Sequence, residues 1–83
     1  DDIVSRQLLL VRVAADHETR AEIIQIMDIF RARIIDIGRR SMIIEATGDE
    51  DKIEAIVKSL QPFGIQEIVK TGVSAMVRSP KEK

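Results

Sequence analysis

Two segments of this 83-residue chain carry apolar residues at the spacing i, i+3, i+4 and i+7, which lines one face of a helix. The residues of the two stripes are Ile23, Ile26, Met27 and Phe30 in the first segment and Ile53, Ile56, Val57 and Leu60 in the second. Thr19 and Glu22 have capping-box spacing before the first stripe, and Asp49 stands as an N-cap before the second. The sequence therefore predicts two helices that each turn one face toward a core.

The segment "SRQLLLVRVAA" (5–15) alternates in side-chain character and predicts a strand. Because successive side chains of a strand point to opposite faces, its central residues divide into two sets. One face carries Leu9, Val11 and Val13, and the other carries Leu8, Leu10 and Arg12.

Three further β-rich segments follow the two helices. "RIIDI" (33–37) and "SMIIEAT" (41–47) flank "GRR", where Gly38 can take a positive φ, and predict a hairpin. "IQEIVKTGVSAMVRS" (65–79) predicts one long last strand with a bulge at Gly72.

The resulting order is β-α-β-β-α-β, which predicts an α+β, ferredoxin-like fold with a four-stranded antiparallel sheet and both helices on one face. The first helix is expected to end near Arg31 or Ala32, so that "DIFRARIIDI" (28–37) is a corner from helix to strand. At this length the chain is expected to be a single domain, residues 1–83, with a thin core.

No catalytic, cofactor-binding or metal site is predicted. His17 is the only histidine, and its neighbours Asp16 and Glu18 cannot easily converge on one ion with it. The chain has no cysteine, which excludes disulfides and thiolate chemistry and suits a reducing compartment. "TGDEDK" opens a helix as phosphate loops do, but its three acids would repel phosphate.

Composition argues against nucleic acid and membrane partners. The formal net charge is −1, and the two aromatic residues, Phe30 and Phe63, are expected on a helix and in a loop rather than on the sheet where bases stack. Arg39 and Arg40 form only a small basic hairpin tip. Without a membrane-length apolar run or a signal peptide, the expected location is cytoplasmic.

The sheet face opposite the helices is the one feature that points to a function. Leu8, Leu10, Ile43 and Met76 are expected there, mixed with Arg12, Glu45 and Arg78. An apolar face left open in this way usually meets a partner. The alternative is a partly apolar face that simply meets solvent, which is common in antiparallel sheets.

Four segments together resemble one family. "SRQLLLVRV", "DIFRARIIDI", "TGDEDKIEAIVKSLQPFGIQEIVKTG" and "VSAMVR" are similar, in order and spacing, to the carboxy-terminal domain of the regulatory small subunit of acetolactate synthase (acetohydroxyacid synthase). The resemblance extends from about Ser5 to Arg78. The hairpin "GRRS" is more basic than the family's turn, and the family's amino-terminal ACT domain is absent.

The resemblance implies a regulatory subunit and not an enzyme. It implies that the chain forms a homodimer and helps to activate a large catalytic subunit, which uses thiamine diphosphate, magnesium and a flavin in branched-chain amino acid biosynthesis. The effector site of the family lies in the ACT domain, so no effector residue is assigned here. The predicted partner interface consists of Leu8, Leu10, Arg12, Arg31, Arg33, Met76 and Arg78, although Arg31 and Arg33 fit a solvated corner equally well.

Three other functions stay open at this point. A stand-alone amino-acid sensor of the same fold would bind branched-chain amino acids, which calorimetry would detect. A small enzyme such as an acylphosphatase would need an arginine-bearing phosphate loop, and the sequence offers no convincing one. A purely structural dimerisation module cannot be separated from the regulatory reading by sequence.

Overall fold

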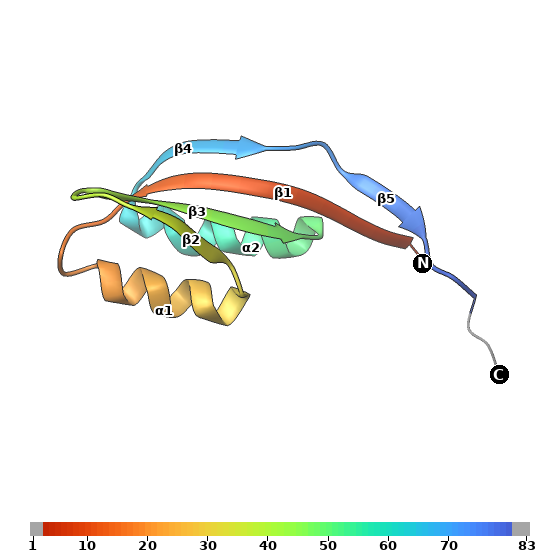
Figure 1. Ribbon diagram of the computed structural model, residues 1–83, viewed down its shortest axis with the longest axis horizontal. Coiled ribbons are helices and arrows are strands. Elements are labelled where there is room, and N and C mark those ends of the chain that lie inside the picture. Colours follow the sequence, from red (N-terminus) through yellow and green to blue (C-terminus); the bar gives the residue numbers. More distant parts are fainter. Residues whose placement is uncertain (1–2, 81–83) are drawn as a thin grey trace.

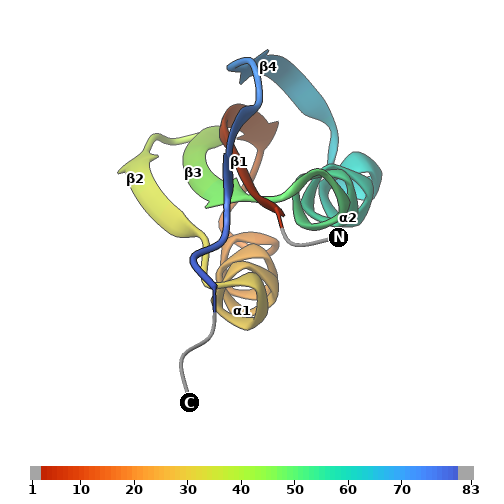
Figure 2. The same cartoon turned by 90° about the vertical axis from the view of Figure 1, so that its right-hand side faces the viewer.

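The computed structural model describes residues 3–80, which form one sheet and two helices that cover one of its faces (Figures 1 and 2). The elements in chain order are β1 (Ile3–Ala14), α1 (Arg20–Phe30), β2 (Arg33–Ile37), β3 (Ser41–Gly48), α2 (Glu50–Leu60), the 3-10 helix η1 (Gln61–Phe63), β4 (Ile65–Lys70) and β5 (Ser74–Val77). The main sheet has the order β2-β3-β1-β4 with antiparallel pairing throughout. The predicted ferredoxin-like fold is confirmed.

The core lies between the sheet and the helices, and the predicted alternation of β1 is correct. Leu9, Val11 and Val13 are buried toward the helices. The two stripes are also correct, with different depths along each helix. Fully buried stripe residues are Ile23, Met27, Ile53, Ile56 and Leu60, while Ile26, Phe30 and Val57 pack partly buried at the edge of the same core.

Helix α1 begins differently from the prediction, whereas α2 begins as predicted. The Thr19 hydroxyl accepts from the backbone N–H of Asp16 at 3.0 Å, and the Asp16 carboxylate accepts from the N–H of Thr19 at 2.8 Å. The hydroxyl is therefore turned back into the preceding loop, and the capping box with Glu22 is not formed. At α2, Asp49 accepts from the N–H of Lys52 at 2.9 Å, as an N-cap should.

The corner between α1 and β2 is a Schellman motif with arginine at the left-handed position. Arg31 has φ 58° and ψ 34°, its N–H donates to Asp28 at 3.1 Å, and the N–H of Ala32 donates to Met27 at 2.9 Å. These two bonds satisfy the last helical carbonyl groups and reverse the chain direction within two residues. The helix can therefore run into β2 without a loop.

The predicted hairpin of β2 and β3 is present, but Gly38 does not adopt a positive φ. Its N–H donates to the carbonyl of Ser41 at 2.8 Å, which closes the turn. The Arg20 guanidinium donates to the carbonyl oxygens of Gly38 and Arg39 at 3.1 and 3.2 Å. The hairpin is thus tied to the start of α1 by a side chain.

The predicted last strand is two strands. Residues 71–73 separate β4 from β5, and these three residues lie opposite two residues of β1, Gln7 and Leu8. This is the one-residue surplus of a bulge, although the surplus also interrupts the strand. The Thr71 hydroxyl accepts from the N–H of Leu8 at 2.9 Å, and the Thr71 N–H donates to the Leu8 carbonyl at 3.0 Å. Thr71 therefore holds the joint against β1.

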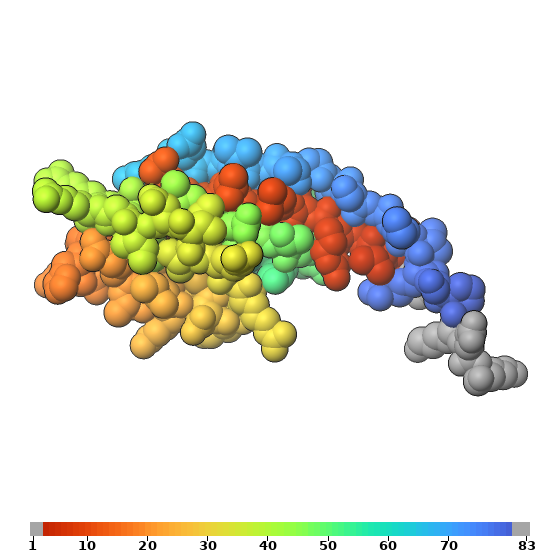
Figure 3. All heavy atoms as spheres, in the orientation of Figure 1, coloured from red at the N-terminus to blue at the C-terminus, as the bar shows by residue number. Residues whose placement is uncertain are grey.

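Beyond this joint, β5 pairs only with the first residues of β1, Ile3 to Arg6. We call this two-stranded extension, Ile3–Arg6 with Ser74–Val77, the β1–β5 ribbon. It projects past the helices and gives the molecule an elongated outline of 52 × 24 × 19 Å (Figures 1 and 3).

Candidate partner interface

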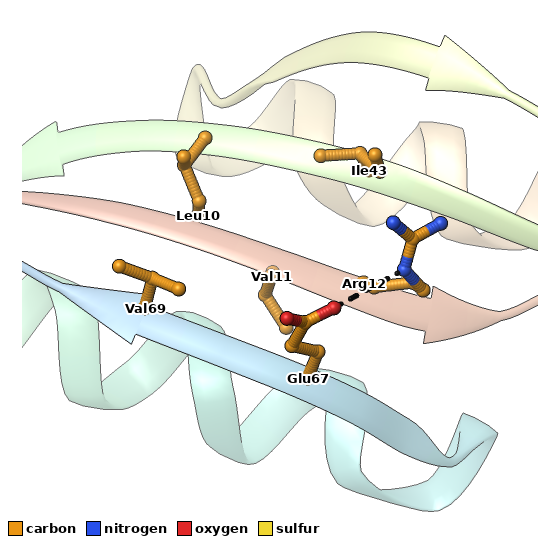
Figure 4. A pocket seen from close by; sticks show the side chains of 6 residues that line it. All are labelled: Leu10, Val11, Arg12, Ile43, Glu67 and Val69. Carbon is orange, nitrogen blue, oxygen red and sulfur yellow. Dashed lines mark ion pairs between the residues drawn. The ribbon is translucent and has the colours of Figure 1, made fainter.

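The open face of the sheet, which we call the outer face, is ordered by strand register into two neighbouring rows across the strands. The first row runs Arg33, Glu45, Leu10, Val69, and the second runs Asp36, Ile43, Arg12, Glu67. Figure 4 shows Leu10, Ile43 and Val69 around the middle of this face, in front of the strands and helices. The outer face therefore has an apolar centre with charged residues on β1 and on the strands beside it.

Two ion pairs lie on the outer face, and both are loose. Arg12 Nε lies 3.5 Å from Glu67 Oε1, and Arg33 Nη1 lies 4.0 Å from Glu45 Oε1. The Arg33 side chain is 80% exposed. Exposed pairs of this geometry contribute about 0–1 kcal/mol each. These charges are therefore available to pair with another molecule at little cost.

A shallow hollow of about 140 Å³ lies between these residues, lined by Leu10, Val11, Arg12, Ile43, Glu67 and Val69 (Figure 4). Sites for small ligands usually enclose about 300–1,000 Å³. The hollow is smaller than that and open, so its size suits one or two inserted side chains.

The structure brings some of the predicted interface residues together. Leu8, Leu10 and Arg12 all lie half-buried on the outer face, and Arg33 joins the row of Leu10. Arg31 does not belong to these rows, because its left-handed backbone forms the end of α1. Whether any of these residues contacts a partner stays a prediction.

Met76 and Arg78 lie at the far end of the molecule. Met76 is opposite Val4 in the β1–β5 ribbon, so it shares the outer face with Leu10 by register. Six residues of strand separate Val4 from Leu10, which corresponds to about 20 Å. Met76 is 76% exposed, and Arg78 follows β5 and is also exposed. The predicted interface residues therefore span the length of β1 instead of forming one cluster.

Val69 and Glu67 belong to the outer face and were not predicted. In a regular strand Ile65, Glu67 and Val69 would share one face. The pairing shifts between Arg12 and Val13, so that Ile65 lies opposite buried Val13 while Val69 lies opposite Leu10. The bulge thus moves Ile65 to the core side, and nothing in the local sequence signals this exchange.

The loop of His17 is organised by hydrogen bonds. Asp16 accepts from the N–H groups of Thr19 and Glu18 at 2.8 and 2.9 Å, and Thr19 Oγ1 lies 3.1 Å from the same carboxylate oxygen. Donation from the Thr19 N–H, and then from its hydroxyl, lowers the pKa of Asp16 below its ordinary value of 3.8. Within residues 3–80, no group of three His, Cys, Asp or Glu side chains could hold a metal ion.

No helix of the described residues is long and apolar enough to span a membrane.

Comparison with known proteins gives consistent matches over nearly the whole chain. Residues 6–79 match the family model described as the small subunit of acetolactate synthase. The chain is 51% identical over 79 residues to the probable acetolactate synthase small subunit of Archaeoglobus fulgidus, covering 95% of this chain and 50% of that protein. It is 46% identical over 81 residues to the acetolactate synthase small subunit of Mycobacterium leprae, covering 98% of this chain and 48% of that protein.

A solved structure agrees. The crystal structure of the acetolactate synthase small subunit from Thermotoga maritima superposes with a TM-score of 0.89 at 40% identity, over 96% of this chain and 49% of that one. The chain spans about half the length of the curated relatives it matches most closely in these comparisons.

Proposed function

Because the chain belongs to the family of acetolactate synthase small subunits, we propose that it is a non-catalytic regulatory module. In this proposal it forms a homodimer and supports the activation of a catalytic large subunit in branched-chain amino acid biosynthesis, in the cytoplasm. The large subunit would carry thiamine diphosphate, magnesium and a flavin, and the chain itself would hold no cofactor. Neither nucleic acid nor a membrane is a proposed partner.

The observation that supports an assembly role is the outer face. Leu10, Ile43 and Val69 surround a hollow of side-chain size, between arginine and glutamate side chains whose ion pairs are loose. Covering apolar surface of this kind contributes about 25 cal/mol per Å². Charged groups at the rim favour one orientation of the partner over others.

The test is to titrate the chain into a cognate large subunit with pyruvate and measure acetolactate formation. We expect the rate to rise with added chain until it saturates. Leu10→Glu places a charge in the proposed contact and should abolish the increase, because an unpaired buried charge is costly. Circular dichroism checks that this variant still folds.

A matched control changes the opposite surface. Glu54 is exposed on α2, on the side of the helix away from the core, so Glu54→Arg should activate as the native chain does. Unchanged activity together with absence of co-sedimentation would exclude the chain as an activating module. Loss of activation in both variants would place the contact outside the outer face.

A further inference from the structure

The β1–β5 ribbon has apolar side chains on both faces and no helix beneath it. Ile3 and Val77 are opposite each other on one face, 54% and 73% exposed, while Met76 stands on the other. A two-stranded ribbon alone is marginally stable in water. The ribbon is therefore expected to be covered in the working assembly.

The outer face of the ribbon continues that of the main sheet. Along β1 the same face carries Val4, Arg6, Leu8, Leu10 and Arg12, with Leu8 in the middle. Leu8 is opposite Thr47 on β3 and hydrogen-bonds to Thr71. The face thus has two halves of similar length on either side of Leu8.

We propose that two copies stack their outer faces about a two-fold axis that passes over Leu8 and Thr47. The ribbon of each copy then lies on the main sheet of the other. This arrangement rests on the homodimer proposed above and adds its surface and symmetry. A half-turn about the axis places Leu8 over the partner's Leu8, Arg6 over the partner's Leu10, and Val4 over the partner's Arg12. Face-to-face packing of sheets about 10 Å apart is an ordinary arrangement.

Charge complementarity supports this register. Glu45 is opposite Leu10 on β3, so an Arg6 side chain above the partner's Leu10 comes within reach of the partner's Glu45. The existing contact of Glu45 with Arg33 is long, at 4.0 Å, and does not compete strongly. Each interface would contain this Arg6–Glu45 pair twice, because the two-fold axis repeats it.

The apolar groups are also matched. Met76 is opposite Val4, and Glu67 is opposite Arg12, so the same half-turn brings Met76 over the partner's Glu67 and the adjoining hollow. Methionine adapts to irregular contacts because its side chain is unbranched and flexible. The exposed Met76 and the unfilled hollow therefore account for each other.

The area is sufficient only when the ribbon takes part. From strand spacing and rise, the main sheet offers about 500 Å² in projection and the ribbon about 130 Å² more. Stable interfaces bury about 800 Å² of accessible surface per partner. Because side-chain relief makes accessible area larger than projected area, full overlap of both faces approaches this value.

Cross-linking tests the axis directly, because the chain contains no cysteine. Thr47→Cys lies on the axis and should give a covalent dimer with a bismaleimide that spans the ~10 Å between stacked sheets. Val4→Cys and Arg12→Cys should each fail to cross-link alone and should cross-link when the two proteins are mixed. Glu54→Cys on α2 is the control and should stay uncross-linked.

Charge reversal tests the ion pair. Arg6→Glu and Glu45→Arg should each raise the dimer dissociation constant at least tenfold in sedimentation equilibrium. The double variant should recover most of this loss. Arg39→Glu makes the same charge change at the hairpin tip and should leave the constant unchanged.

The outcomes separate this arrangement from the proposed function. A dimer that cross-links at Thr47 and in the Val4 and Arg12 mixture supports the two-fold stack. A dimer without these cross-links retains the proposed homodimer and overturns the arrangement. A monomer at all concentrations overturns both the homodimer and the stack, and protection of Thr47→Cys by the large subunit alone would assign the face to that partner.

Discussion

The most specific consequence of the fold concerns Arg31, which holds the left-handed position of the Schellman motif at the end of α1. An L-residue in this conformation costs about 1–2 kcal/mol, and glycine avoids the cost because it has no Cβ. Glycine also makes the unfolded chain more flexible, which offsets about 0.5–1 kcal/mol of the gain. Arg31→Gly is therefore expected to stabilise the fold by about 0.5–1 kcal/mol.

The assay is thermal unfolding followed by circular dichroism. For a domain of this size, 1 kcal/mol corresponds to about 4–8 °C in the midpoint, so we expect an increase of about 2–8 °C. Two variants separate conformation from charge. Arg31→Ala removes the charge but keeps the Cβ, and should leave the midpoint nearly unchanged. Arg33→Gly makes the same substitution in an extended strand, where glycine should destabilise.

The reasoning is wrong if Arg31→Gly and Arg31→Ala have the same midpoint, since only the conformational argument distinguishes them. A fall in the Arg31→Gly midpoint would show that the arginine side chain stabilises the corner by more than its backbone costs. Either result would remove the left-handed strain from the account of how α1 passes into β2.

The remaining predictions concern the core, a helix cap and a pKa. Ile56→Ala should cost about 2–5 kcal/mol in denaturant unfolding, and Phe30→Ala less than the 3–5 kcal/mol of a fully buried ring, because Phe30 is only partly buried. Asp49→Ala should cost about 1 kcal/mol through loss of the α2 cap. The folded-state pKa of Asp16 is lowered, so its contribution to stability is present above 3.8 and is lost as the pH falls through the folded value. NMR titration should place its midpoint below 3.8, and Thr19→Ala, which removes the hydroxyl, should raise it.

What the sequence predicts well depends on local periodicity. The alternation of β1 separates Leu9 from Leu10 correctly, and the helical stripes identify Met27 and Ile56 as core residues. These patterns need no knowledge of the partner element, because side-chain direction follows from the backbone period alone. The order of such segments was sufficient to predict the fold.

What the sequence could not predict depends on which atoms are adjacent in the folded chain. The capping box failed because Asp16, three residues earlier, competes for Thr19. Val69 was missed because the bulge next to Ile65 is visible only in the pairing with β1. The hydroxyl of Thr71 likewise reveals its role only beside Leu8. In each case two local patterns were compatible, and the tertiary contact selected one.

The split of the last strand follows from the different lengths of the central strands. β3 ends at Gly48, opposite Gln7, because Asp49 must turn the chain into α2. β1 therefore continues toward its amino end without β3, and β5 becomes its only neighbour there. Since no helix reaches this extension, its side chains cannot be buried within the monomer. The same strand thus serves two purposes: its odd-numbered residues from Leu9 onward build the monomer core, and its even-numbered residues are left for an interface that extends over its whole length.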